Sequence, residues 1–237
     1  MIIYTEGTIP GRLGVGPIAV LKDDTIISRC VERTGRLDHD QELIPRIVDL
    51  IEPGAVVVDA GAMIGDHTSA YASKAGLVYA FEPHPENFEC LRQNCASLPG
   101  CLLFQKALSD VAGPAKLRNC FDFSNMGGGS VDLASGNIEI NTITLDSLGI
   151  SPQLIKMDVE GYEVKALRGA ERTIARSRPI LVLEVNLHAL ENAGDSVQAL
   201  ADILAEYRYE SRDIMYGSPL KGDCQHPLYD VVCRPIA

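Results

Sequence analysis

The chain has 237 residues, of which 46% are hydrophobic and 22% charged, and this balance excludes a disordered protein. Its 32 acidic and 21 basic residues give a net charge of −11, which repels phosphate backbones and disfavours nucleic acid as a partner. No apolar run reaches the ~18–20 residues of a membrane span, and the 7 scattered cysteines, without a Cys-x-x-Cys pair, are typical of reduced thiols in the cytoplasm.

Residues 1–38 are predicted to form an N-terminal β-hairpin cap. Two strand-like runs, 17–22 and 25–32, are joined at a pair of aspartates where the chain can turn. A helix over residues 40–51 is expected to follow, because it is periodic and ends before a Pro-Gly pair.

From residue 56 onward, short apolar runs alternate with helical patterns. The runs are continuous, as expected of strands covered on both faces, whereas the helices carry apolar residues at three- and four-residue spacings. The predicted strands are 56–59, 77–82, 102–108, 154–160 and 180–186, and the predicted helices are 67–74, 86–96, 162–176 and 196–207. This alternation predicts an α/β fold with a doubly wound parallel sheet.

Two segments interrupt the alternation. Residues 111–145 contain strand-like runs around a Gly- and Ser-rich stretch, and we expect a β insertion after the third strand. The stretch 125–136 is a candidate lid or acceptor-recognition loop, or a tip without function. Two strand-like runs at 209–217 and 227–235 predict a final antiparallel hairpin, so that residues 1–237 are expected to form one domain.

The strongest local signal is VVVDAGAMIGDHT, residues 56–68. The strand ends in Asp59, and Gly61 and Gly65 let the backbone turn sharply toward a helix N-terminus while a ligand approaches the main chain. A dinucleotide fingerprint would need Gly-x-Gly-x-x-Gly. The Gly-x-x-x-Gly spacing after an acid disfavours a pyrophosphate and favours a cationic ligand with an amino-acid end.

The second predicted strand ends in Glu82, 23 residues after Asp59, where a carboxylate can accept both hydroxyls of a ribose. Pro83 ends this strand, and Asn87 opens the next helix. An acid, a glycine turn and a ribose acid in this order favour S-adenosylmethionine as the cofactor, and an ordinary βαβ unit with a surface glutamate is the alternative.

Four motifs together resemble the FkbM-type S-adenosylmethionine-dependent methyltransferases. They are DAGAMIGDHT (59–68), FEPHPENFECLRQN (81–94), ALSD (107–110) and KMDVEGYEVKALRGA (156–170). The resemblance implies a class I methyltransferase (Rossmann-like) fold with seven strands in the order 3-2-1-4-5-7-6 and strand 7 antiparallel. It also implies a cofactor site at Asp59, Gly61, Ala62, Gly65, His67, Thr68, Glu82, Pro83, Asn87, Ala107, Leu108 and Asp158. One position departs from the family pattern, because Met63 stands where the family usually has Asn.

Polar residues follow the fourth and fifth predicted strands, beside the expected cofactor site. Lys156 and Asp158 share a face of the fourth strand, and a lysine inside an apolar strand needs a carboxylate partner. Glu184 and His188 follow the fifth strand. Methyl transfer to oxygen needs a base for the hydroxyl proton, and Asp158, Glu184 and His188 are the candidates. Asp158 ranks first, because strand 4 is expected to adjoin strand 1.

The same groups have other interpretations. Lys156, Asp158 and Glu184 could form a buried structural ion-pair network, and the carboxylates could hold a divalent cation, although no spacing indicates a metal. His67 could instead be a surface residue at a helix start, like His84. A basic stripe on the predicted helix 162–176 is expected to be a solvated face balanced by glutamates, and a homodimer contact or an anionic partner is the alternative.

The resemblance implies that the acceptor is a hydroxyl of a sugar, a glycan or a natural product. Amino-methylating nucleic-acid enzymes use an Asn/Asp-Pro-Pro-aromatic turn after strand 4, where this chain has Asp-Val-Glu-Gly at 158–161. The alternatives are a catalytically inactive adenosylmethionine-binding subunit of the same fold, which the Met63 departure favours slightly, and a dehydrogenase, against which the missing dinucleotide fingerprint counts.

Overall fold

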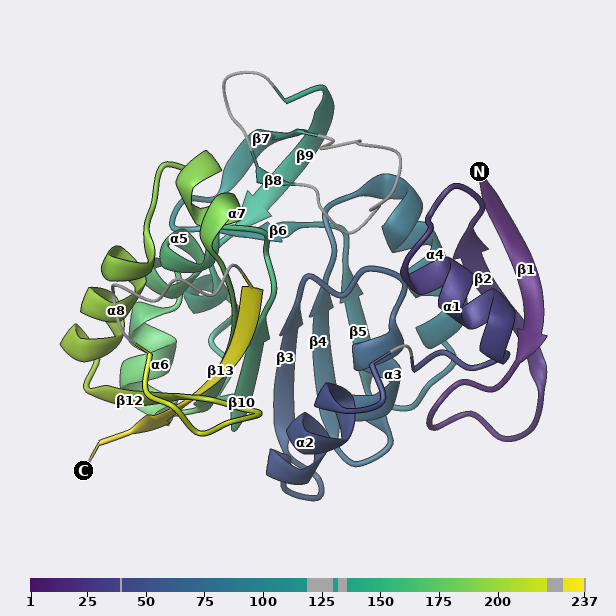
Figure 1. The fold of residues 1–237 in the computed structure, drawn as a ribbon, viewed down its shortest axis with the longest axis horizontal. Coiled ribbons are helices and arrows are strands. Elements are labelled where there is room, and N and C mark those ends of the chain that lie inside the picture. Colours follow the sequence, from purple (N-terminus) through teal and green to yellow (C-terminus); the bar gives the residue numbers. More distant parts are fainter. Residues whose placement is uncertain (39, 119–129, 132–135, 221–227, 237) are drawn as a thin grey trace.

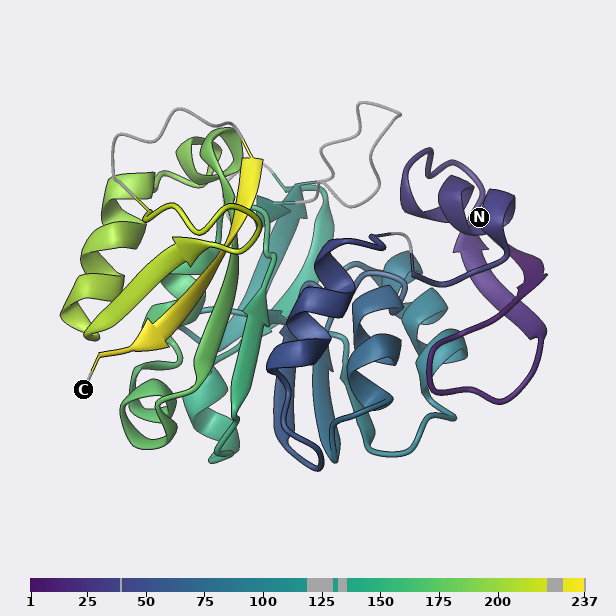
Figure 2. The ribbon, with the colours of Figure 1, turned by 60° about the horizontal axis from the view of Figure 1, so that its bottom comes forward.

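The structure is a computed structural model that describes residues 1–38, 40–118, 130–131, 136–220 and 228–236. Its centre is a seven-stranded sheet with helices on both faces (Figures 1 and 2). The strands lie in the order β5 (Cys101–Phe104), β4 (Leu77–Phe81), β3 (Val56–Ala60), β10 (Leu154–Met157), β11 (Ile180–Asn186), β13 (Leu228–Pro235) and β12 (Tyr209–Asp213). β13 is antiparallel to both of its neighbours, and the order matches the one that the resemblance implies.

The central strands are apolar throughout because both of their faces are covered. In β3, Val57 belongs to a buried cluster with Ile47 of α2 and Tyr71 of α3, whereas Val58 belongs to a cluster with Leu167 of α5 on the other face. The first face carries α2 (Leu43–Leu50), α3 (Asp66–Ala72) and α4 (Pro85–Cys95), and the second carries α5 (Glu163–Arg168), α6 (Glu171–Ser177) and α8 (Val197–Glu206).

The N-terminal cap is a hairpin, but not between the predicted runs. β1 (Ile2–Gly7) pairs antiparallel with β2 (Gly16–Leu21), and the run 25–32 forms most of α1 (Ile27–Thr34). The strand prediction for 25–32 was wrong because the Asp24 carboxylate accepts hydrogen bonds from the backbone N–H groups of Ile26 (3.1 Å) and Ser28 (2.6 Å). These local hydrogen bonds favour a turn that leads into a helix instead.

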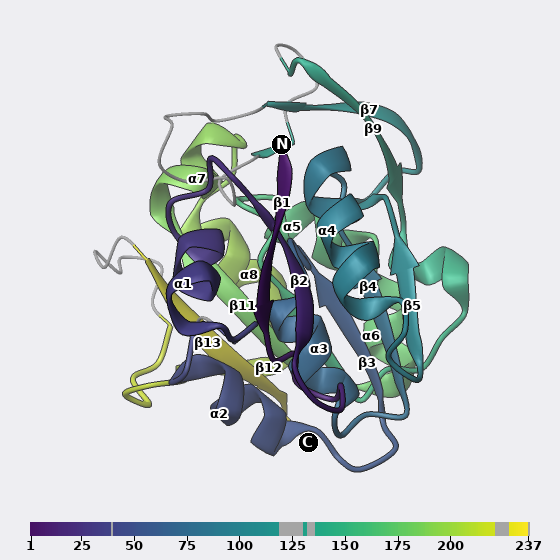
Figure 3. The same cartoon turned by 90° about the vertical axis from the view of Figure 1, so that its right-hand side faces the viewer.

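The Asn94 side chain fastens this cap to the rest of the molecule. Its Oδ1 accepts from Ala19 N at 2.8 Å, and its Nδ2 donates to Ala19 O at 2.9 Å and to Ile64 O at 2.8 Å. Ala19 lies in β2 and Ile64 in the turn after β3, so one buried amide of α4 joins the hairpin to the turn. Figure 3 shows the hairpin and α4 side by side.

The predicted β insertion is present as a separate four-stranded sheet. Its order is β6 (Ala107–Leu108), β9 (Ile138–Ile143), β7 (Gly113–Arg118) and β8 (Ser130–Val131). The single strand predicted over 102–108 was wrong, because its first half pairs with β4 and its last two residues pair with β9. The candidate loop 125–136 lies almost wholly outside the described residues.

The helix predicted over 162–176 is two helices, α5 and α6, with Gly169 between them. A Cβ atom at Gly169 would lie 1.9 Å from Ser109 O, so this glycine lets the insertion approach the helical layer. Two residues of the basic stripe pair with aspartates on other elements instead of the glutamates expected: Lys165 with Asp195 at 3.0 Å and Arg172 with Asp146 at 3.3 Å.

Among the described residues, every helix is too short or too polar to cross a membrane. The five cysteines that can be assessed in the described part of the chain, Cys30, Cys90, Cys95, Cys101 and Cys233, are free thiols. The single domain over residues 1–237 and the homodimer stay predictions.

Candidate active site

The turn after β3 lies directly against the end of β10. The backbone N–H groups of Gly61 and Ala62 both donate to Phe81 O at 3.0 Å, which holds the turn beside β4. Gly61 has a φ of 84°, and a Cβ atom there would lie 1.7 Å from the carbonyl oxygen of Asp158. Only glycine allows this approach, which places the turn next to the candidate base.

Glu82 is held by backbone groups at the end of β4. One carboxylate oxygen accepts from Met63 N at 2.9 Å and the other from His84 N at 2.8 Å. Burial raises the pKa of Glu82 to about 7, although these hydrogen bonds act to lower it. The carboxylate therefore has a fixed orientation, and it faces the cavity described next.

A cavity of about 350 Å³ is lined by residues at the ends of β3, β4 and β10. The β insertion lies at this end of the sheet (Figure 1). The lining of the cavity contains ten of the predicted site residues: Gly61, His67, Glu82, Pro83, Asn87, Ala107, Leu108, Lys156, Asp158 and Glu184. Ile26, Ile27 and Leu43 add an apolar wall from the N-terminal segment. The strand ends, the insertion and the N-terminal segment thus enclose one space.

Four residues predicted to bind the cofactor do not line this cavity. Asp59 and Thr68 lie beneath the turn, where the Thr68 hydroxyl donates to Asp59 at 2.6 Å, and Ala62 and Gly65 belong to the turn itself. Asp59 is fully buried, and a Cβ atom at Gly65 would lie 2.5 Å from Cys95 Sγ. Their position indicates that they shape the turn, rather than lining the cavity.

The histidines also differ from the predictions. His188 is exposed on α7 (Leu187–Asn192), because Asn186 caps this helix and Ala189 and Leu190 form its buried side. We therefore do not retain His188 as a candidate base. His67 and His84 stand near helix starts as expected, but both are buried and line the cavity, so the surface interpretation was wrong.

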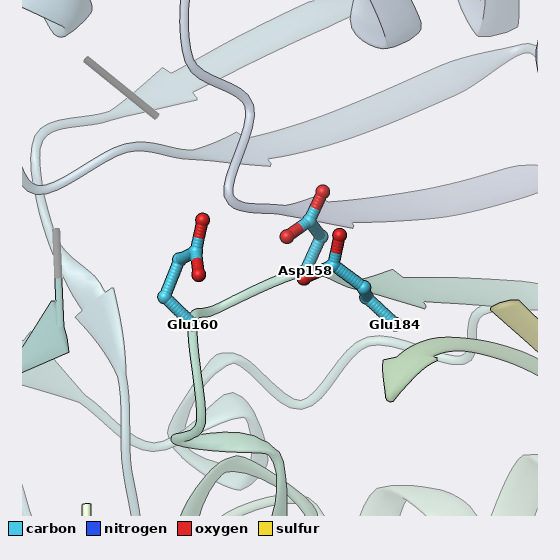
Figure 4. A group of neighbouring side chains, drawn as sticks. All are labelled: Asp158, Glu160 and Glu184. Atoms are coloured by element: carbon cyan, nitrogen blue, oxygen red, sulfur yellow. The ribbon is translucent and has the colours of Figure 1, made fainter. Parts of the chain in front are cut away.

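A cluster of carboxyl groups lines the cavity where β10 and β11 end. Asp158, Glu160 and Glu184 have oxygens that all lie within 4.8 Å of one another (Figure 4). Lys156 Nζ, which is almost fully buried, donates to Asp158 Oδ2 at 3.0 Å. The expected pairing of Lys156 with a cleft carboxylate is therefore present.

Burial and the charges of neighbouring groups shift the pKa values of the three carboxyl groups in this cluster. Burial would raise the pKa of Asp158, but the adjacent Lys156 ammonium outweighs it and the pKa is lowered. Burial first, and then the Asp158 charge, raise the pKa of Glu160 to about 8 and that of Glu184 to about 11. Asp158 is ionised at neutral pH, and its two neighbours favour their protonated forms. The oxygens of the three residues are also close enough to hold a divalent cation, which stays the alternative interpretation of the cluster.

The loop that carries Glu160 is strained and tightly braced. Glu160 has a φ of 51°, which is uncommon for a residue with a side chain. The Glu163 carboxylate accepts from the N–H groups of Val159 and Gly161 at 3.2 Å each, and a Cβ atom at Gly161 would lie 2.1 Å from Ala189 O. The DVEGYE motif thus encodes a rigid turn that directs Glu160 to the cavity.

Sequence reasoning did not assign several lining residues to the site, namely Asp66, His84, Lys106, Tyr162 and Asp230, and it noted Glu160 only as a polar residue after the fourth strand. Asp66, Glu160 and Tyr162 stand inside motifs that were already identified, so their neighbours were a usable signal. Asp230 lies on β13 opposite Glu184, and only the pairing of β11 with β13 brings the two together. Burial, followed by the charge of Asp158, raises the pKa of Asp230 to about 7.

A model of the methyltransferase FkbM domain matches residues 59–211, which is more than half of the chain. This chain belongs to the FkbM methyltransferase family. The matched part contains the glycine turn and the acids of β10 and β11, whereas Asp230 and the N-terminal cap lie outside it.

One curated relative is hexuronic acid methyltransferase AglP of Haloferax volcanii, 29% identical over 174 residues that cover 70% of each chain. The crystal structure of methyltransferase FkbM from Methylobacillus flagellatus KT matches with a TM-score of 0.53 and 19% identity. That match covers 78% of this chain and 44% of the other, so this chain spans less than half of that protein. A Streptococcus mutans protein crystallised in complex with SAH matches with a TM-score of 0.50 and 10% identity, covering 81% and 95%. Both structures share the class I methyltransferase fold.

The cavity fits the methyl donor of such an enzyme. Glu82 presents a fixed carboxylate for a pair of hydroxyl groups. The Asn87 side chain is buried beside it, and its Oδ1 has no hydrogen-bond partner among the described residues. At the other side, the carboxyl oxygens of Asp158, Glu160 and Glu184 can face a cation. A nucleoside that carries a sulfonium group fits both sides of the cavity, because it has ribose hydroxyls for Glu82 and a positive charge for the acidic residues.

Proposed function

We propose that this methyltransferase transfers the methyl group of S-adenosylmethionine to a hydroxyl group of a sugar or glycan. The observation that carries the proposal is that one cavity joins the Glu82 carboxylate, the glycine turn and the Asp158 carboxylate. The acceptor class is supported by the relative whose name specifies a hexuronic acid as its substrate. A hydroxyl group of a small natural product is the wider form of the same proposal.

In this proposal the bound cofactor supplies an electrophilic methyl group, and residues of the chain bind and orient the cofactor and the acceptor. Glu82 accepts hydrogen bonds from the ribose hydroxyls, with Asn87 beside it. Asp158 accepts a hydrogen bond from the acceptor hydroxyl and takes its proton as the new C–O bond forms. Lys156 keeps Asp158 ionised before transfer, because its ammonium lies 3.0 Å from Asp158 Oδ2.

Calorimetric titration with S-adenosylmethionine, S-adenosylhomocysteine and NAD tests the cofactor. We expect both sulfur nucleotides to bind the wild type, NAD to fail, and Glu82→Ala to lose binding by about tenfold to a hundredfold, as for the loss of charged hydrogen bonds. Glu86→Ala is the matched control, because Glu86 is an exposed acid at the start of α4. Binding of NAD alone, or equal effects of the two variants, would contradict the proposal.

Transfer of a labelled methyl group to a panel of glycosides and uronic acids tests the reaction. We expect Asp158→Asn to lower the rate by about 10²–10⁴-fold while the cofactor still binds. Binding without transfer to any acceptor, in the wild type, would favour the inactive binding subunit instead. The cytoplasm remains our proposed location, supported by the free thiols of the described residues.

A further inference from the structure

Four carboxyl groups from three strands face one part of the cavity. Asp158 and Glu160 follow β10, Glu184 lies on β11, and Asp230 lies opposite Glu184 on β13. Lys156 is the ammonium next to them, and it is already paired with Asp158. The Glu184 Oε2 atom is buried and accepts no hydrogen bond among the described residues. The cluster therefore has more acids than its one paired cation can balance.

Carboxylates this close to one another in a partly desolvated site cannot all be ionised, and some of them hold protons. Burial and the neighbouring charge of Asp158 give Glu160, Glu184 and Asp230 pKa values of about 8, 11 and 7. Among the described residues, the charged or titratable groups that act on the cluster from other elements are Asp40 before α2, His67 on α3, Glu163 on α5 and Asp213 on β12. A cation that enters the cavity favours the ionised forms, and its removal favours the protonated forms.

We propose that this acid cluster gains or loses a proton in response to the charge of the methyl donor. It releases a proton when the sulfonium cation enters the cavity, and it accepts one during methyl transfer. The inference rests on the proposed function, because it takes S-adenosylmethionine as the donor.

The charges before and after methyl transfer explain why a proton should move to the cluster. The S–CH₃ bond breaks and its electron pair stays on sulfur, which becomes a neutral thioether. The O–CH₃ bond forms, and the acceptor O–H proton passes to a carboxylate of the cluster. A sulfonium and a carboxylate are thus replaced by a thioether and a carboxylic acid, so the net charge of the cavity stays the same. A desolvated site avoids the cost of an unpaired charge in this way.

The two sulfur nucleotides form a matched pair for the test, because they differ in the methyl group and its positive charge. We would titrate each into the wild type at pH 7.0, in buffers with different ionisation enthalpies, and obtain the protons released per site. We expect S-adenosylmethionine to release about one proton more than S-adenosylhomocysteine. The affinity for S-adenosylmethionine should then rise with increasing pH more steeply than the affinity for S-adenosylhomocysteine. The difference should be up to about tenfold per pH unit.

Variants show whether the proton comes from the cluster. Glu160→Gln and Asp230→Asn should each reduce the difference in proton release, whereas Glu86→Ala should not. S-adenosylhomocysteine binding and a melting curve report whether each variant is folded. Equal proton release by the two nucleotides in the wild type would overturn the inference. An unchanged difference in both folded cluster variants and in folded Glu184→Gln would also overturn it, because the proton would then not come from the cluster. Failure of both nucleotides to bind would instead refute the proposed function.

Discussion

The close contact between Gly61 and Asp158 leads to a prediction that can be isolated by a matched substitution. Gly61 and Gly54 both have left-handed backbones, with φ values of 84° and 79°. A Cβ atom at Gly61 would lie 1.7 Å from Asp158 O, whereas a Cβ atom at Gly54 would have no atom within 4 Å. Alanine at either position carries the same backbone cost, so the difference between the two variants measures the steric contact alone.

The backbone cost of alanine in this region is about 1–2 kcal/mol. Gly61→Ala must also move the turn away from the end of β10 by more than an ångström, and overpacking of this kind adds about 1–3 kcal/mol. We therefore expect a loss in the free energy of unfolding of about 1–2 kcal/mol for Gly54→Ala and about 2–5 kcal/mol for Gly61→Ala.

Urea denaturation followed by circular dichroism measures both free energies, and calorimetry measures cofactor binding. Because the displaced groups line the cavity, we expect Gly61→Ala to weaken the binding of S-adenosylhomocysteine at least tenfold and Gly54→Ala to leave it unchanged. Equal stability losses, or wild-type affinity in Gly61→Ala, would show that the turn does not depend on this contact.

Three further predictions concern the cap and the charged cluster. Asn94→Ala removes three buried hydrogen bonds and should lower the free energy of unfolding, measured by urea denaturation, by about 2–4 kcal/mol. Gln93→Ala, at the half-exposed neighbouring position, should lower it by less than about 1 kcal/mol. Similar losses in the two variants would contradict the role of Asn94 in holding the cap. Lys156→Met should lower the free energy of unfolding by about 3 kcal/mol at pH 7, because it leaves the Asp158 carboxylate, which is only 33% exposed, without its partner. A variant more stable than the wild type would argue against the ion pair. Glu160 has a folded pKa of about 8, above its unfolded value, so the native state holds more protons and stability should fall as pH rises from about 5 to 8. Melting temperatures across this range should fall less steeply in Glu160→Gln, and an identical pH profile would refute the shift.

Several parts of the site were predictable because they depend on short stretches of chain. The apolar runs of β3, β4, β10 and β11 indicated buried strands, and the glycine turn and Glu82 were identified from their order. Lys156 needed a carboxylate partner because it stands in an apolar strand, and the structure places Asp158 beside it. These inferences rest on backbone conformation and on the burial of residues that are close in sequence.

Other features depend on contacts between distant segments. The run 102–108 divides because its first half pairs with β4 and its last two residues pair with β9. The formation of α1 is a local exception, because it depends on Asp24 hydrogen bonds that an apolar pattern does not show. Asp230 joins the acid cluster only through the pairing of β13 with β11. The protonation of that cluster is decided by burial and by like charges from three strands, which are properties of the folded chain. The sequence alone therefore predicted the family and the sheet and singled out Glu82, whereas tertiary packing decided which acids share the cavity and what charge they carry.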